Sequence, residues 1–311
     1  MNIMSLINAL PGASAQGLIW GIMAIGVYLT FRILDVADLT VDGTMCTGGA
    51  VCVMMLMSGH NIWVSMLAAT GAGMLAGLAT GIFHTFMGIP AILAGILTQL
   101  GLYSANLKIM GKANQAVNGN KYNLLVSLRN VKNVPFYQNT ILIVAIFIVV
   151  LIAILYWFFG TELGCSLRAT GCNPNMSRAQ GINTDVCKVL GLMISNGLVA
   201  LSSALLAQYQ GFADVNMGRG AIVIGLAAVI IGEVLGEAIF GKRLNFIGRL
   251  AFVAIGAIIY YVVIAFVLWL GLPSEDMKLF SAIVVAIFLA IPYLRGKSKT
   301  SFKRAAKNGG N

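Results

Sequence analysis

The side chains best suited to chemistry are a few carboxylates that interrupt long apolar stretches. Asp38 and Asp42 lie in the segment LDVADLTVDGT, and Asp214 lies in QYQGFADVNMGRG, whereas Glu233 follows a third apolar run. Such carboxylates could bind a cation or a proton on a route through a membrane, because charges at membrane depth are costly and usually face a cavity. Alternatively, an aspartate near a helix start caps it by accepting backbone N–H bonds. We expect the capping role for Asp38 and Asp214, with proximity to a pathway as its consequence.

The other reactive side chains form no catalytic or metal-binding pattern. His60 and His84 stand alone, without a Cys, Asp or Glu at ligand spacing. The five cysteines show no such spacing either, and we expect no disulfide, since three of them lie near a segment predicted to be cytosolic. No G-x-x-x-x-G-K-[ST] phosphate loop occurs. We therefore expect no catalytic residue, metal or cofactor in this chain, and energy for any transport must come from an ion gradient or a partner.

The composition is that of a protein embedded in a lipid bilayer. Hydrophobic residues make up 59% of the 311 positions and charged residues only 10%, whereas a soluble domain carries roughly a quarter charged residues. The long apolar runs favour helices over the alternating pattern of a barrel. The net charge of +10 is better explained by basic cytoplasmic loops than by nucleic-acid binding. The predicted fold class is an all-α polytopic membrane protein.

The apolar runs predict one transmembrane domain over residues 1–294 and a basic cytoplasmic tail over 295–311. Met1–Leu10 is too short to span, and Pro11 is expected to end it at the membrane interface. About nine spanning helices, some of them broken, are expected at 17–34, 44–58, 62–83, 89–108, 140–159, 188–208, 221–236, 249–270 and 278–294.

Basic residues give the expected orientation in the cell (plasma or inner) membrane. The tail over 295–311 is rich in Lys and Arg and should be cytoplasmic. With about nine spans, the N-terminus then lies outside, and the polar segment 168–183 lies inside. The 109–138 loop falls outside although it is basic, and its length fits an external docking surface.

The two carboxylate-bearing segments indicate an inverted repeat. Both contain Ala-Asp followed by glycine, and they lie five helices apart, an odd offset that inverts the second copy. Paired glycine-interrupted segments in two halves of a chain point to a central transport pathway. The pathway candidates are Asp38, Thr40, Asp42, Asn196, Gln208, Asp214 and Asn216. For Asn196, interhelical hydrogen bonding is the commoner use.

Small residues recur every four positions in the third expected helix, at Ala69, Gly73, Gly77 and Gly81. This spacing lets a second helix approach closely, since lipid supplies no hydrophobic drive for helix packing. We expect the ridge to pack within one subunit rather than between subunits.

The segment RATGCNPNMSRAQGIN, residues 168–183, is a polar island between two apolar stretches. Asn173 can cap a helix, Pro174 suits the first helical position and Gly181 suits a left-handed stop. A helix of about two turns is only marginally stable alone. The island therefore predicts a short helix outside the membrane that docks on another protein.

The stretch from Gly164 to Glu233 resembles the permease subunits of ABC importers in the branched-chain amino-acid permease superfamily. The RATG-x-N-x-x-x-x-R-A-x-GIN portion is similar to that family's cytoplasmic coupling loop. AQYQGFADVNMG, GLAAVIIGE and LDVADLTVDGT resemble a subgroup linked in part to tryptophan or tyrosine uptake. The residues assigned to the coupling segment by this resemblance are Arg168, Gly171, Asn173, Pro174, Arg178, Ala179, Gly181, Ile182 and Asn183.

The resemblance implies a homodimer or pseudo-dimer of permeases, two ATPase subunits that bind ATP and Mg²⁺, and an external solute-binding protein. It also implies inward movement of a small solute, an amino acid and in some relatives an aromatic one, by alternating access. The competing hypothesis is a self-sufficient secondary transporter or channel that uses Asp38, Asp214 or Glu233 as ion or proton ligands. A membrane anchor or scaffold would not need so many glycine-interrupted helices.

Overall fold

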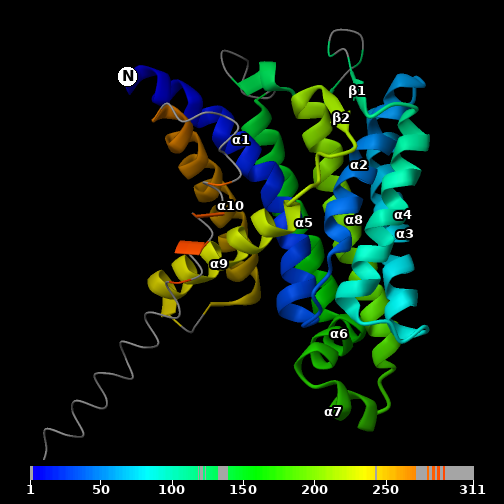
Figure 1. Ribbon diagram of the computed structural model, residues 1–311. Helices are drawn as coiled ribbons and strands as arrows, with labels where there is room; N and C mark the ends of the chain where they lie inside the picture. The colour runs from blue at the N-terminus through cyan, green and yellow to red at the C-terminus, as the bar shows by residue number, and fades with distance from the viewer. Residues whose placement is uncertain are drawn as a thin grey trace, which may run out of the picture.

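The protein is a bundle of long helices in this computed structural model (Figure 1). The structure describes residues 3–270, except 118, 120–121, 123, 132–138 and 242–243. It also describes scattered positions between 279 and 290. Within these residues, eight helices are long and apolar enough to cross a membrane. The predicted all-α, multi-pass fold is therefore confirmed. The predicted ninth helix, 278–294, lies almost entirely outside the described residues, and the tail over 295–311 lies entirely outside them.

The elements follow the predicted order with few differences. The helices are α1 (Ile3–Tyr28), which continues into a π-helical turn (Leu29–Ile33), α2 (Thr40–Met57), α3 (Ile62–Thr85), α4 (Ala91–Met110), α5 (Thr140–Gly160), α6 (Glu162–Cys172), α7 (Pro174–Ala179), α8 (Thr184–Gln210), α9 (Ala221–Phe240) and α10 (Phe246–Trp269). Short segments add the strands β1 (Asn114–Ala116) and β2 (Phe212–Asp214) and a 3-10 turn (Leu128–Val131).

The expected break at Pro11 is wrong, because α1 runs through this proline without interruption. A proline removes one backbone hydrogen bond, but helices in membranes tolerate it when neighbouring groups satisfy the freed carbonyl. The N-terminal segment is therefore the first part of a spanning helix, whose apolar window covers Ile7–Ile33.

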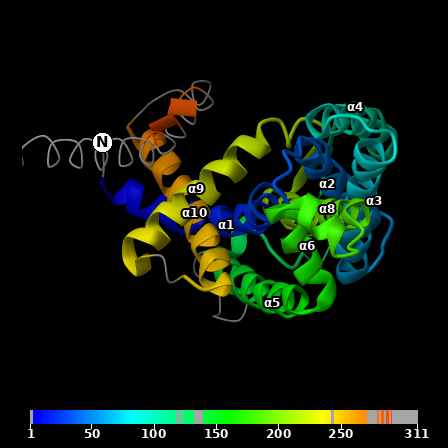
Figure 2. The same cartoon turned by 90° about the horizontal axis from the view of Figure 1, so that it is seen from below.

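α1 and α8 lie at the centre of the bundle. α8 packs against α3, α2 and α1, and α1 also packs against α9 and α10. Figure 2 shows the result along the bundle, with α3 and α4 on one flank, α9 and α10 on the other, and α5 beside the centre. α1 is accordingly the most completely buried of the described spanning helices, followed equally by α8 and α2.

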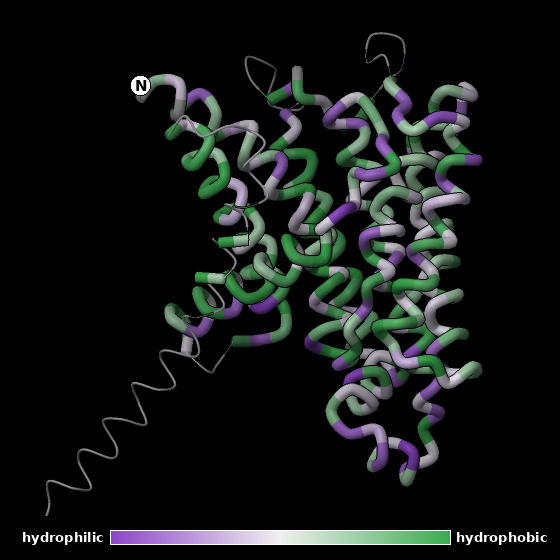
Figure 3. The backbone as a smooth tube through the Cα atoms, viewed as in Figure 1, coloured by the Kyte–Doolittle hydropathy of each residue, from purple (hydrophilic) through white to green (hydrophobic). Residues whose placement is uncertain are grey.

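The connecting segments separate into two ends of the bundle. The start of α1 lies at one end with β1 and β2, and α6 and α7 lie at the other, which we call the α7 end (Figure 1). Hydrophilic residues gather on α6 and α7 (Figure 3). The N-terminus and the 168–183 island thus lie at opposite ends, in the relative arrangement that the sequence predicted.

The small-residue ridge of α3 packs against α8 within the same chain. Ala69 is fully buried, and a Cβ added to Gly73 or Gly77 would collide with a backbone carbonyl of α8, that of Asn196 or Leu192. The predicted packing within one subunit is confirmed, and the two helix backbones are as close as glycine permits.

Replacing Gly77 by alanine is expected to lower the stability of the protein by about 1–3 kcal/mol, because the added methyl group forces α3 and α8 apart. Thermal unfolding of the purified protein in detergent measures this change. Gly71→Ala on the same helix is the matched control, since its Cβ meets no atom within 4 Å. Alanine there should be neutral or stabilising by up to about 1 kcal/mol. Equal melting temperatures for the two variants would contradict the close contact.

Candidate transport site and docking helix

α2 begins inside the bundle rather than at its surface. After the π-helical turn the chain reverses at Asp35, which has a φ of 55°, and an extended segment leads back to Thr40. Asp38 is 2% exposed, and its Oδ1 accepts the Thr40 backbone N–H at 2.9 Å. Its Oδ2 accepts the Asn196 side-chain amide at 2.6 Å. The predicted capping role of Asp38 is therefore confirmed.

Hydrogen bonds between side chains extend this contact across four helices. Asn196, which lies midway along the 27-residue α8, accepts the Thr44 hydroxyl at 2.7 Å. The Thr40 and Thr80 hydroxyls are 2.6 Å apart, and Thr80 donates to Thr98 at 2.9 Å. α2, α3, α4 and α8 thus share one buried network, in which these polar side chains hydrogen-bond to one another and to the backbone.

α9 begins at the buried Ala221, directly after the exposed Gly220, and a residue of α2 caps it. The Asp42 carboxylate accepts the Gly220 N–H at 2.9 Å and the Ile222 N–H at 3.0 Å. Asp214 was expected to cap this helix, and that prediction is wrong. Asp214 instead accepts the Asn216 N–H at 2.6 Å within its own turn. It lies too far before α9 in the sequence, so Asp42 reaches the helix start in its place.

The loop between α4 and α5 is joined to the segment before α9. β1 and β2 pair antiparallel, with Asn114 opposite Asp214 and Ala116 opposite Phe212. The Asn114 side chain also donates to Asp214 at 3.3 Å. Asp214 and Asn216 therefore belong to a structural corner opposite the α7 end.

A cavity of about 260 Å³ lies between α2, α4 and the turn that precedes α9. Of the seven pathway candidates, only Asp42 lines it. Asp38, Thr40, Asn196 and Gln208 are buried elsewhere, at 0–2% exposure. The residues that line the cavity are Asp42, Gly43, Cys46, Gln99, Leu100, Tyr103, Asn106, Val215 and Arg219.

Sequence reasoning missed the α4 side of this cavity. Gln99, Tyr103 and Asn106 are spaced by four and three residues, so they share one face of the helix. This stripe of polar side chains along α4 was the signal in the sequence that could have indicated the cavity. Arg219 belongs to the segment QYQGFADVNMGRG but is not among the predicted pathway candidates.

Glu233 is engaged in an ion pair between helices. Arg32, in the π-helical turn after α1, donates to the Glu233 carboxylate through Nε at 3.0 Å and through a second, shorter contact from its terminal nitrogen. Glu233 and Glu237 lie four residues apart and are followed by Lys242 and Arg243, a pattern that predicts an inner salt-bridge cluster. The two basic residues lie outside the described part of the chain. The observed partner of Glu233 comes from the other half of the protein.

The 168–183 island forms the predicted capped helix, α7. Asn173 Oδ1 accepts the Met176 N–H at 3.1 Å, and Pro174 occupies the first helical position. Gly181 has a φ of 83°, and the Ile182 N–H donates to the Ser177 carbonyl at 3.0 Å. This 6→1 bond with a left-handed glycine is a Schellman stop. Both predicted helix boundaries are confirmed.

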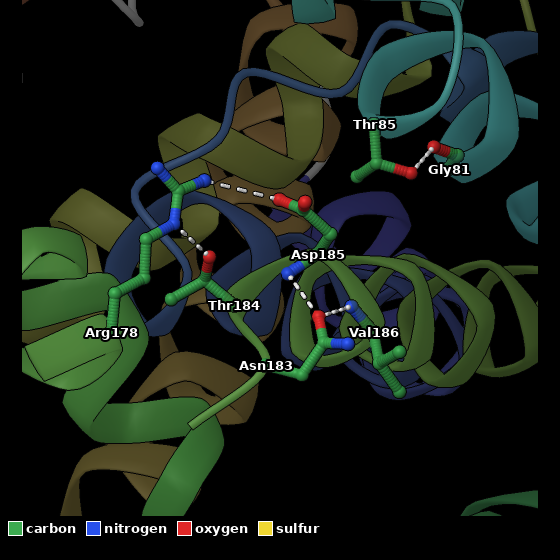
Figure 4. A network of polar contacts seen from close by, with 7 residues as sticks. All are labelled: Gly81, Thr85, Arg178, Asn183, Thr184, Asp185 and Val186. Atoms are coloured by element: carbon green, nitrogen blue, oxygen red, sulfur yellow. Dashed lines mark hydrogen bonds and ion pairs between the residues drawn. The ribbon is translucent and has the colours of Figure 1, made fainter. Parts of the chain in front are cut away.

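Polar bonds fix α7 to the start of α8. Arg178 donates through Nε to Thr184 at 2.7 Å and through a terminal nitrogen to Asp185 at 3.3 Å (Figure 4). Asn183 caps α8 by accepting the N–H groups of Asp185 and Val186, each at 3.2 Å. The short helix is therefore held rigidly although it projects beyond the bundle.

Close packing fixes the preceding helix, α6, to the π-helical turn that follows α1. A Cβ at Gly171 would collide with the Ile33 carbonyl, and Arg168 donates to the Phe159 carbonyl at 2.8 Å. The outer face of α7 is free of such contacts in the described structure, with Met176 59% exposed and Ala179 also exposed. The nine predicted coupling residues thus lie together at one end of the bundle, on α6, α7 and the junction with α8.

These features define a multi-pass membrane protein of the transporter class, with one helix that begins inside the bundle and an exposed, capped helix at one end. Residues 11–292 match the family described as "Branched-chain amino acid transport system / permease component". The chain belongs to this family of ABC-transporter permeases.

Individual relatives extend over most of the chain. It is 40% identical over 293 residues, 94% of both chains, to a protein named tyrosine transport system permease protein from Clostridioides difficile. It is 28% identical, over 80% of its length and 68% of the other, to the fructose import permease protein FruF of Bifidobacterium longum. Among solved structures, it resembles a chain of PsaBC from Streptococcus pneumoniae in complex with Fab, at a TM-score of 0.55 and 14% identity over 92% and 95% of the two chains. The last likeness concerns the fold alone.

The buried Asp38–Asn196 bond should make the effects of the two side chains strongly non-additive. Asp38→Ala alone removes the acceptor of one Asn196 N–H, and Asn196→Ala alone removes one donor of the buried Asp38 carboxylate, which keeps the Thr40 N–H. Each should cost about 2–4 kcal/mol. The double variant should be less destabilised than the sum by about 1–3 kcal/mol. Thermal or denaturant unfolding of the four purified proteins gives the coupling. Additive effects would show that the bond contributes little to the bundle.

Proposed function

We propose that this chain is the membrane subunit of an ATP-driven importer for an amino acid, with an aromatic amino acid as the first candidate. The observation that carries the proposal is α7, a capped helix that is held firmly at its base and leaves its outer face uncovered. Such a helix suits a separate ATPase that binds ATP and Mg²⁺. The relative named for tyrosine transport supports the choice of solute.

The contacts at the base of α7 support a route for motion into the bundle. α6 packs on the Ile33 backbone through Gly171, directly before the segment that leads to α2. Arg178 binds the start of α8, and α8 carries Asn196, the partner of Asp38. A displacement of α7 by closing ATPase subunits would therefore reach both central helices. A bundle with two stable arrangements would convert it into alternating access.

The proposal also specifies how the chain is oriented in the membrane and which proteins it binds. The α7 end faces the cytoplasm, and the end with β1 and β2 faces outward, towards a solute-binding protein. A second copy of the permease completes the membrane domain.

The competing proposal is a secondary transporter or channel that needs no ATPase. Its candidate ion ligands are engaged in structural bonds: Asp38 caps α2, Asp214 closes a turn and Glu233 pairs with Arg32. These bonds disfavour cyclic binding and release of an ion at the same groups.

Proteoliposomes separate the two proposals. The permease reconstituted with its ATPase and binding protein should accumulate L-tyrosine or another amino acid when ATP is supplied to the ATPase side. Uptake should disappear when the ATPase is inactivated by mutation. Accumulation by the permease alone, driven by an ion gradient, would overturn the importer proposal. ATP-dependent uptake of a sugar but of no amino acid would overturn the proposed solute.

Replacing Gly181 by valine should weaken association with the ATPase at least about fivefold, because a β-branched residue at this left-handed position disrupts the stop of α7 at a cost of roughly 1–2 kcal/mol. Co-purification or surface binding of the ATPase measures the effect. Gly59→Val is the matched control, since Gly59 has a φ of 85° at the opposite end of the bundle. If both variants bind the ATPase like the parent protein, α7 is not the docking element.

A further inference from the structure

We propose that the cavity between α2, α4 and the turn before α9 is a binding site for an amino-acid zwitterion on the transport route. Arg219 would bind the carboxylate, and Asn106 together with Asp42 would bind the ammonium group. This inference rests on the proposed function for its solute class, and it adds the site and the groups that recognise the solute.

The charges around the cavity match a zwitterion. Among its lining residues Asp42 and Arg219 are the charged ones, and they carry opposite signs. Within the described residues, Arg219 takes part in neither of the two ion pairs, which join Arg32 to Glu233 and Arg178 to Asp185. A guanidinium presents a fork of N–H donors that fits a carboxylate.

Asn106 supplies a second, independent indication of a ligand. The residue is 1% exposed, and its Nδ2 lies 3.5 Å from the Gly43 carbonyl oxygen. Its Oδ1 is buried and has no hydrogen-bond partner in the described structure. A buried acceptor of this kind costs free energy unless a donor reaches it. Asn106 lines the cavity, and a turn of its side chain towards the cavity would bring this shielded oxygen to a bound ammonium group, which would provide such a donor.

Asp42 can bind an ammonium group while it caps α9. Its two oxygens accept one backbone N–H each, from Gly220 and Ile222. An ionised carboxylate offers about four acceptor positions, so half of them remain for another donor. Occupancy of the cavity would thereby be linked to the start of α9, and helix starts are a common position of solute sites in transporters.

The size and the walls of the cavity restrict the solute further. Its volume of about 260 Å³ corresponds to eight or nine waters at roughly 30 Å³ each, which suits one amino acid. Leu100, Tyr103 and Val215 give the cavity an apolar and aromatic wall. This wall favours a solute with an apolar or aromatic side chain.

Binding of labelled L-tyrosine to the full chain in lipid nanodiscs tests the site, with two analogues as competitors. Tyramine lacks the carboxylate, and 3-(4-hydroxyphenyl)propionate lacks the ammonium group. Each analogue should compete at least about tenfold more weakly than L-tyrosine, since each loses a charge-assisted contact. L-tryptophan and L-leucine serve as further probes.

Two variants assign each end of the solute to its residue. Arg219→Gln should weaken L-tyrosine binding at least about tenfold and change tyramine binding less than about twofold. Asn106→Leu should weaken L-tyrosine binding and leave the propionate analogue unaffected. Arg219→Lys should restore part of the affinity, because it keeps the charge but loses the fork. Lys108→Gln and Ser104→Ala, on exposed positions of α4, are controls expected to bind like the parent protein.

The outcomes separate this site from the proposed function. Equal loss of tyrosine and tyramine binding in Arg219→Gln overturns the assignment of the carboxylate. Binding of none of the three amino acids, or unchanged binding in both variants, overturns the site. The proteoliposome experiment above tests the proposed function independently of the site. If a complex that carries either variant takes up the amino acid with ATP and with an unaltered KM, the site is overturned and the proposed function stands.

Discussion

The structure depends on satisfying the backbone N–H groups where α2 and α9 begin. α2 starts among buried residues, with Asp38 and Thr40 at 2% and 0% exposure, and α9 starts at the buried Ala221, directly after the exposed Gly220. A backbone N–H group left unsatisfied away from water costs several kcal/mol. Asp38 supplies the cap for α2, and Asp42, four residues later, supplies the cap for α9. One short segment of the first half of the chain thus stabilises a broken helix in each half.

This arrangement explains why the polar residues of the bundle are mostly engaged in structural bonds. Asp38 requires Asn196 as a second donor, and Asn196 in turn binds Thr44. The close approach of α3 to α8 at Gly73 and Gly77 keeps this network dry and closely packed. Side chains held in this way couple the helices to one another, but their polar groups are not free to bind and release a solute.

The sequence predicted the helices well, because apolar length, glycine spacing and cap residues act locally. Asn173, Pro174 and Gly181 each impose one backbone requirement, and α7 satisfies all three. The prediction failed where a contact joins distant segments. The Ala-Asp motif made Asp214 look equivalent to Asp38, but only the folded chain brings Asp42 to the start of α9. The prediction of a helix break at Pro11 was wrong because a membrane helix can continue past a proline that would interrupt a soluble one.

Asp42 joins α2 directly to the start of α9. It lies in the first turn of α2 and at the first N–H groups of α9, so its carboxylate faces the positive ends of two helix dipoles. The α2 segment that carries it is anchored to α8 through Asp38 and Asn196, and α8 begins at the base of α7. A change in the angle of α8 must therefore alter the bonds of Asp42 to α9 unless α2 moves together with both helices. The same carboxylate lines the cavity, so the cap of α9 and the candidate solute site share one side chain.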